Sequence, residues 1–225
     1  PIVDVSLRAI IYYEALVRGP NGESAYSILD QVTPALMYRF DQACRIRAIE
    51  LASDLGMQEK LSINFLPNAV YEPKACIQAT LETAHRVGFP TERLNFEITE
   101  TERVKDRGHM RKIIESYREM GFTTSLDDFG NGYANLDLLT DLRPDTLKLD
   151  RELVMDCDRD KRRQAILKSL VTLAGTLGTQ LIAEGVETRE ESRCLLALGI
   201  PVQQGYYFSY PNLESLATID EAKYD

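Results

Sequence analysis

The chain has 225 residues, of which 44% are hydrophobic and 27% charged, and it carries a net charge of −9 with a pI near 4.9. This length allows one large domain or two small ones with a conventional core. The acidic balance, with no run of Lys and Arg interleaved with aromatic residues, argues against DNA or RNA binding.

Short apolar segments alternate along the chain with longer segments of helical period. In chain order the pattern predicts a strand over 9–16, a helix over 34–56, a strand over 61–65, a helix over 74–87, a strand over 94–99, a helix over 110–120, a strand over 123–127, a glycine-rich loop with a short helix from 135, a strand over 146–149, a helix over 162–177, a strand over 180–183, a helix over 189–198 and a strand over 202–207. Gly56, Gly178 and Gly199 are expected to end the helices that precede them.

This alternation predicts a parallel α/β fold, and the number of units favours a compact (β/α)8 TIM-type barrel. A doubly wound open sheet is the alternative. No linker or internal repeat is visible, so residues 1–225 are expected to form a single domain. A start at Pro1 rather than at methionine suggests that this domain was excised from a longer protein.

Cysteine and histidine give no sign of a site. The four cysteines have no CxxC spacing, which indicates neither a zinc site nor a disulfide framework, and reduced thiols in the cytoplasm are expected. His85 and His109 both fall in polar helical segments, where an ordinary surface role is expected. No apolar run approaches the roughly 20 residues that span a bilayer.

Polar residues stand at the ends of the predicted strands, where the chemistry of a barrel collects. The most informative is the pair Asp127-Asp128, which closes an apolar segment and precedes a glycine-rich turn. The full set of strand-end residues is Glu14, Asn64, Glu97, Glu100, Asp127, Asp128, Lys148, Asp150, Glu184, Glu187 and Gln204.

Each of these residues also has an ordinary interpretation, such as a helix cap, a turn or a surface ion pair for Lys148. Together, however, so many carboxylates around one barrel mouth would repel one another, and bound divalent cations would remove that cost. The oxygen-rich set therefore predicts a site for two cations, Mg²⁺ or Mn²⁺, rather than zinc.

A series of ordered motifs then resembles a known family. The segment Tyr13-Glu14-Ala15-Leu16-Val17-Arg18 is similar to the signature of the EAL domains, which are cyclic-di-GMP phosphodiesterases of bacterial signalling. The resemblance continues through Asn64-Phe65-Leu66-Pro67, Phe96-Glu97-Ile98-Thr99-Glu100, Asp127-Asp128-Phe129-Gly130, Leu147-Lys148-Leu149-Asp150, Ala183-Glu184-Gly185-Val186-Glu187 and Gln204-Gly205-Tyr206. It covers essentially the whole chain.

The resemblance implies a modified barrel with its first strand antiparallel, and hydrolysis of cyclic-di-GMP to linear pGpG. It implies that Glu14, Asn64, Glu97 and Asp127 bind the first metal ion, and that Asp127 bridges to a second ion held by Asp128. By the same resemblance, Lys148 holds or polarises the attacking water, Gln204 orients it, and Glu184 is a general base or a ligand of the second metal.

For the substrate, the resemblance implies that Arg18 contacts a phosphate, with Leu16 and Glu187 as further contacts. Glu100 resembles the residue that braces the glycine loop. The chain departs from the common family pattern at Leu66, Asn131, Ala134 and Asn135, none of which matches a metal ligand. These departures concern loop regulation and dimer coupling.

The family also implies partners. They are cyclic-di-GMP, a second copy through the helices beside the glycine loop, and a sensor or receiver domain elsewhere in the full-length protein, which could be tethered to a membrane. The main alternative is a degenerate EAL domain that binds the dinucleotide or a protein without hydrolysis. A barrel glycosidase is more distant, because two carboxylates suffice for that chemistry and leave Asn64 and Lys148 unexplained.

Overall fold

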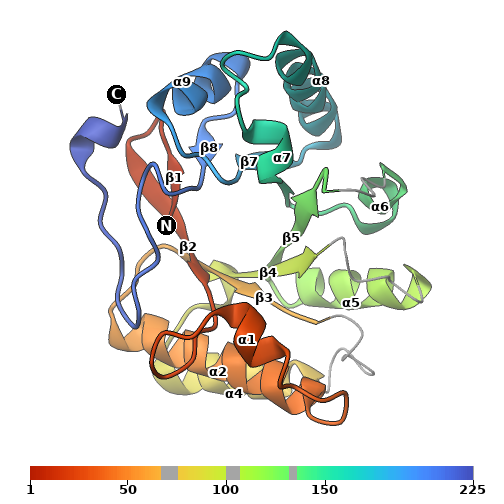
Figure 1. Ribbon diagram of the computed structural model, residues 1–225. Helices are drawn as coiled ribbons and strands as arrows, with labels where there is room; N and C mark the ends of the chain where they lie inside the picture. Colours follow the sequence, from red (N-terminus) through yellow and green to blue (C-terminus); the bar gives the residue numbers. More distant parts are fainter. Residues whose placement is uncertain (67–75, 100–106, 132–135, 225) are drawn as a thin grey trace.

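The computed structural model of the chain describes residues 1–66, 76–99, 107–131 and 136–224, and within them the strands close into one barrel in sequence order (Figure 1). The strands are β1 (Ile2–Asp4), β2 (Ala9–Ala15), β3 (Lys60–Asn64), β4 (Leu94–Thr99), β5 (Thr123–Phe129), β6 (Thr146–Leu149), β7 (Gln180–Ala183) and β8 (Val202–Gln203). Closure confirms the predicted barrel and excludes the open sheet.

Strand β1 runs antiparallel to both of its neighbours, β2 and β8, whereas β2 to β8 run parallel to one another. This is the modified barrel that the family resemblance implied. Strand β1 itself was not among the predicted strands, because three residues are too few to show a period of two. Its direction points its first residues toward the barrel end where β2 to β8 finish, and Ile2 pairs with Tyr12 in the middle of β2.

Helices cover most of the outside of the barrel, and the C-terminal segment runs beside β1 and β2 (Figure 1). The helices are α1 (Ala25–Leu29), α2 (Met37–Asp54), α4 (Gln78–Val87), α5 (Arg107–Glu119), α6 (Leu136–Leu142), α7 (Arg151–Val154), α8 (Lys161–Leu177) and α9 (Arg189–Leu198), with 3-10 turns at Thr91–Arg93 and Glu221–Tyr224. Gly178 and Gly199 cap α8 and α9 in the left-handed conformation, as predicted. Helices α1 and α7 were not predicted, because each is only about one turn long.

Some predicted boundaries were wrong. Helix α2 is shorter than 34–56 at both ends, and Leu55 is its cap, so Gly56 lies one residue beyond. The starts of the predicted helices at 74 and 135 lie outside the described residues. The predicted strand 202–207 ends at Gln203, because the chain turns at Gly205, whose carbonyl accepts a hydrogen bond from the Phe208 amide at 3.0 Å.

Alternation along a strand decides which side chains reach the barrel interior. In β4, Asn95 and Glu97 bond to residues of other strands inside the barrel, whereas Phe96 packs outward, 5.0 Å from the ring of Tyr117 on α5 and 5.2 Å from that of Phe122. Each such buried aromatic ring contributes about 1.5–3 kcal/mol. The outer apolar layer thus fixes the strands, and the inner positions are left for polar residues.

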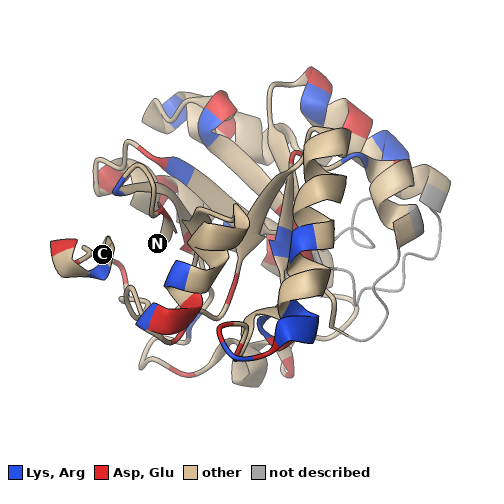
Figure 2. Ribbon diagram, turned by 90° about the horizontal axis from the view of Figure 1, so that it is seen from above, with Lys and Arg blue, Asp and Glu red and all other residues tan. Residues whose placement is uncertain are grey.

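The outer surface carries charges of both signs. Figure 2 shows Lys and Arg interspersed with Asp and Glu over the helices. None of the helices in the described ranges is both long and apolar enough to cross a bilayer. All four cysteines are free thiols.

Candidate active site

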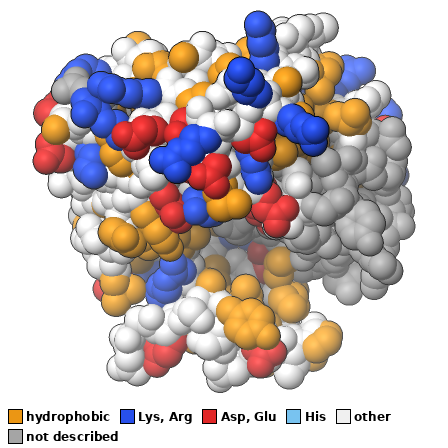
Figure 3. Space-filling model, turned by 45° about the horizontal axis from the view of Figure 1, so that its top comes forward, with side chains coloured by type: hydrophobic (Ala, Val, Ile, Leu, Met, Phe, Trp, Pro, Cys, Tyr) orange, Lys and Arg blue, Asp and Glu red, His pale blue; other side chains and the backbone are white. Residues whose placement is uncertain are grey.

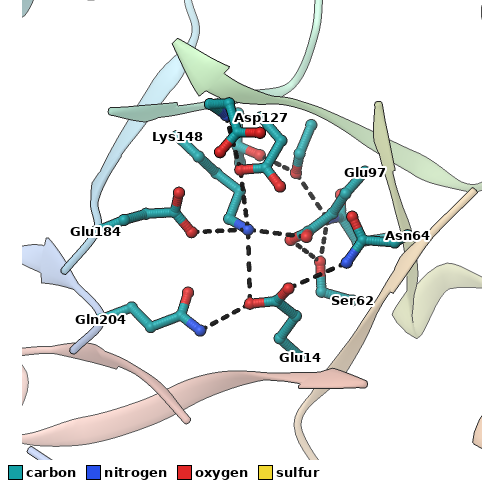
Figure 4. A network of polar contacts seen from close by, with 12 residues as sticks. Glu14, Ser62, Asn64, Glu97, Asp127, Lys148, Glu184 and Gln204 are labelled. Atoms are coloured by element: carbon teal, nitrogen blue, oxygen red, sulfur yellow. Dashed lines mark hydrogen bonds and ion pairs between the residues drawn. The ribbon is translucent and has the colours of Figure 1, made fainter. Parts of the chain in front are cut away.

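Side chains from the ends of the parallel strands meet around the Lys148 ammonium (Figure 4). Its Nζ lies 2.8 Å from Glu97 Oε2 and 2.8 Å from Glu184 Oε1. Asp127 Oδ1 is 3.2 Å away and Glu14 Oε2 is 3.6 Å away. The Lys148 side chain is only 1% exposed, so it is the centre of the cluster and not a surface ion pair.

Two amide side chains complete the cluster on the side of Glu14. Asn64 Nδ2 donates to Glu14 Oε1 at 3.0 Å, and Gln204 Nε2 donates to Glu14 Oε2 at 2.7 Å. Both oxygens of this carboxylate are therefore paired. The remaining oxygen of Gln204, Oε1, is buried and has no hydrogen-bond partner among the described residues.

A β-bulge brings the adjacent residues Asp127 and Asp128 into the same site. Consecutive side chains of a regular strand point to opposite faces, but the pairing of β5 with β6 shifts register between Leu126 and Phe129. Asp128 has a φ of 57°, and its amide donates to Asp127 Oδ1 at 2.9 Å. As a result, Asp127, Asp128 and Glu184 each place an oxygen within 4.8 Å of the others.

Lys148 alone does not offset the burial and mutual repulsion of the carboxylates in this cluster, and several of their pKa values are raised. Burial, opposed only partly by Lys148, raises the pKa of Glu97 to about 8 and also raises that of Glu184. Burial and the neighbouring Asp127 raise the pKa of Asp128 to about 6. Burial alone would raise the pKa of Glu14, but Lys148 and the two amide donors lower it.

The donor set fits divalent cations. Five carboxylates face one ammonium, which leaves four negative charges uncompensated when all are ionised, and two divalent ions would balance them. The donors are carboxylate and amide oxygens, which suit Mg²⁺ and Mn²⁺. The buried and unpartnered Gln204 Oε1 adds a further acceptor beside them.

Some predicted residues lie outside this cluster. Arg18 Nη1 donates to the Val17 carbonyl at 2.7 Å, and Leu16, just beyond β2, is 41% exposed. Glu187 forms an ion pair with Arg151 at 2.8 Å. Glu100 lies outside the described residues. The face shown in Figure 3 is hollowed, and acidic side chains are visible inside the hollow.

The loop that carries Glu184 is held by residues that the sequence analysis did not identify. Arg151, at the start of α7, donates to the Gly185 carbonyl as well as pairing with Glu187. Glu191 of α9 accepts from the Glu187 amide at 2.9 Å and from the Asp156 amide at 2.9 Å. A buried carboxylate that accepts several backbone N–H groups fixes the loop against both neighbouring segments.

Gly205 allows the segment of Gln204 to approach the loop of Glu184 closely. A Cβ at Gly205 would lie 2.0 Å from the Val186 carbonyl oxygen, where backbone would have to move. We expect Gly205→Ala to separate the two segments and to lower the melting temperature. Gly175→Ala is the control, since nothing lies within 4 Å of that position in α8 and alanine favours a helix by about 0.5–1 kcal/mol. Equal melting temperatures for the two variants would contradict this account.

Beneath the cluster lies a set of small polar residues that the sequence analysis also did not identify. Ser62 of β3 donates to Glu97 Oε1, and Asn95 of β4 bonds to Ser62. The available signal was their spacing, since Ser62 and Asn95 each precede a predicted ligand by two residues and so share its face.

Comparison with known proteins agrees with this geometry. The model of the family described as EAL domain matches residues 1–211. The curated relatives include the cyclic di-GMP phosphodiesterase RocR of Pseudomonas aeruginosa, which is 34% identical over 161 residues, or 71% of this chain and 40% of the relative. The chain spans 55% of the length of the antirepressor BluF and 17% of that of the oxygen sensor protein DosP, both of Escherichia coli.

Solved structures match over nearly the whole chain. A standalone versatile EAL protein from Vibrio cholerae O395, in its c-di-GMP bound form, is 47% identical with a TM-score of 0.96, covering 100% of this chain and 95% of that one. Klebsiella pneumoniae BlrP1, in a manganese and cyclic-diGMP complex at pH 6, is 35% identical with a TM-score of 0.91, covering 97% of this chain and 56% of that one. The chain therefore belongs to the EAL domain family.

Proposed function

We propose that this chain is a metal-dependent phosphodiesterase that hydrolyses cyclic-di-GMP to linear pGpG. The observation that carries the proposal is the convergence of the strand-end carboxylates, with Asp127, Asp128 and Glu184 within 4.8 Å of one another. The similarity to RocR, and to EAL structures that contain the dinucleotide, supports the choice of substrate.

The residues that would hold the cations are those whose oxygens converge. When bound, two divalent ions neutralise charge on the phosphodiester and make water a better nucleophile near neutral pH. In this proposal the ligands of the two ions, Mg²⁺ or Mn²⁺, are Glu14, Asn64, Glu97, Asp127, Asp128 and Glu184.

The remaining polar groups act on the attacking water. Glu184 is proposed to take its proton, because its side chain is the most exposed of the four carboxylates that contact Lys148, at 17% against 9% or less for the others. The Lys148 ammonium holds the water and offsets the carboxylate charge. Gln204 is anchored to Glu14 through Nε2, which leaves Oε1 to orient the water by accepting a hydrogen bond.

The proposed substrate contacts lie outside the Lys148 cluster, beyond the strand ends. Arg18 is half-buried beyond the end of β2 and is proposed to bind a phosphate, next to the exposed Leu16. Glu187, 44% exposed, is proposed as a contact to the substrate. We also propose, from the family, that Glu100 braces the glycine loop.

Incubation with cyclic-di-GMP and Mg²⁺, followed by chromatography, tests the proposal. The expected product is linear pGpG, formed only when a divalent ion is added. Retained micromolar binding without any product would identify the chain as a receptor for the dinucleotide.

Calcium is expected to inhibit the reaction. Ca²⁺ takes six to eight ligands at roughly 2.3–2.6 Å, whereas Mg²⁺ requires near-octahedral geometry at about 2.0–2.1 Å, so Ca²⁺ fits the same oxygens without the same geometry. Titration of Ca²⁺ into a Mg²⁺ assay should lower the rate, with recovery on adding excess Mg²⁺. Strong turnover with Ca²⁺ alone would contradict the proposed geometry.

The neighbouring domains and the pairing of this chain are also proposed. Because the chain spans only part of its curated relatives, we propose that it is one domain of a longer cytoplasmic or membrane-tethered signalling protein with a sensor or receiver domain. Pairing of two copies through the helices beside the glycine loop is proposed from the family, and light scattering tests it.

A further inference from the structure

A buried polar layer lies inside the barrel directly beneath Glu97. Its members come from four neighbouring strands and are at most 2% exposed. They are Ser62 of β3, Asn95 of β4, Ser125 of β5 and Thr146 of β6. Inward layers of such barrels are usually filled with branched apolar side chains. A polar layer at this depth therefore needs a reason other than packing.

The hydrogen bonds of the layer form one chain that ends on Glu97. Asn95 Nδ2 lies 2.7 Å from Ser62 Oγ and 2.7 Å from Ser125 Oγ. Ser62 Oγ bonds to Glu97 Oε1, and Ser125 Oγ bonds to Thr146 Oγ1. Figure 4 shows Ser62 beside Glu97, on the side away from Glu184.

The direction of these bonds follows from the chemistry of their members. In the ionised form that binds a cation, the Glu97 carboxylate only accepts, so the single proton of Ser62 points to Glu97. Ser62 can then only accept from its other neighbour, which requires the amide nitrogen of Asn95. The Asn95 amide supplies two N–H groups, one for each serine, so it determines where the Ser62 hydroxyl points.

We propose that Asn95 and Ser62 are positioning residues that hold the Glu97 carboxylate in its cation-binding orientation. The inference rests on the proposed function, in which Glu97 binds a metal ion. Ser62 fixes Oε1 from below while Lys148 contacts Oε2 at 2.8 Å, so the carboxylate plane is set from two directions. Loss of a partner that orients a metal ligand in this way typically costs about 10–100-fold in metal affinity or activity.

The orientation of the Asn95 amide lowers the stability of the fold. Its Oδ1 is buried without a hydrogen-bond partner among the described residues. An unpaired buried acceptor opposes folding, and an apolar side chain would avoid it. Aspartate could not replace asparagine, because it has no N–H to donate and would compete for the Ser62 proton.

Two serine variants separate positioning from simple stability. Ser62→Ala and Ser125→Ala each remove one fully buried hydroxyl that accepts from Asn95, but only Ser62 contacts Glu97. The probe is Mn²⁺ alone, titrated calorimetrically into the 225-residue chain without dinucleotide. We expect Ser62→Ala to weaken Mn²⁺ binding by about 10-fold or more. Ser125→Ala should bind Mn²⁺ with close to the wild-type affinity. The two variants should lose similar amounts of melting temperature.

A double-mutant cycle tests the route from Asn95 to Glu97. Because Asn95 acts through Ser62, Asn95→Ala should weaken Mn²⁺ binding, and the double variant should bind no more weakly than Ser62→Ala. Equal Mn²⁺ affinities for the two serine variants, or a wild type that binds no Mn²⁺, would overturn the positioning role. Where these binding effects appear but no pGpG forms, only the proposed hydrolysis fails.

Discussion

Asp127→Asn is expected to abolish hydrolysis of cyclic-di-GMP while leaving the barrel folded. Asp127 lies at the bulge of β5, 3.2 Å from Lys148 and close to both Asp128 and Glu184. The substitution keeps the shape but removes the charge that is proposed to bridge two cations. A loss of about 4 kcal/mol of transition-state stabilisation corresponds to about a 1,000-fold lower rate.

The measurement is pGpG formation under saturating Mg²⁺, with circular dichroism to verify the fold. Asp54→Asn is the matched control, because Asp54 is exposed at the end of α2 and should retain the wild-type rate. Glu14→Ala is expected to behave like Asp127→Asn, and it also releases the amides of Asn64 and Gln204. Normal turnover in either site variant would rule out the metal assignment.

Lys148→Met is expected to remove both activity and much of the stability of the metal-free protein. Its ammonium contacts four carboxylates, three of them within 3.2 Å. Removing one partner of a buried ion pair costs about 3–5 kcal/mol, which lowers the melting temperature by roughly 10 °C for a chain of this size.

Divalent ions should reverse part of that loss. Thermal unfolding with and without Mn²⁺ measures the effect, and the rise in melting temperature on adding Mn²⁺ should be larger for Lys148→Met than for wild type, because the added charge replaces the missing ammonium. Lys168→Met, at an exposed position of α8, should change neither quantity. A metal-free Lys148→Met protein as stable as wild type would contradict the role given to this lysine.

The fold was predictable where periodicity is strong. The alternation in β4 and the helical period before Gly178 and Gly199 come directly from burial, so those elements were located well. The rule that barrels collect chemistry at strand ends then predicts that Glu14, Asn64, Glu97 and Asp127 lie together.

Other features depend on contacts between distant segments, which single-strand patterns do not contain. The bulge that turns Asp128 toward Glu184 depends on pairing with β6. The central place of Lys148 depends on four other strands closing around it. The residues that brace the site, such as Glu191 and Asn95, are ordinary polar residues whose role appears only when their partners are known.

The reversed direction of β1 determines where a preceding segment of a larger protein would connect to this barrel. In a barrel of uniformly parallel strands, the chain enters at the end opposite the chemistry. Here Pro1 precedes a strand whose first residue, Ile2, pairs with Tyr12 of β2, and the Pro1 ammonium contributes to the electrostatic field at Glu14. Any segment that precedes Pro1 would emerge at the end of the barrel that carries Glu14, one strand pair away from that carboxylate.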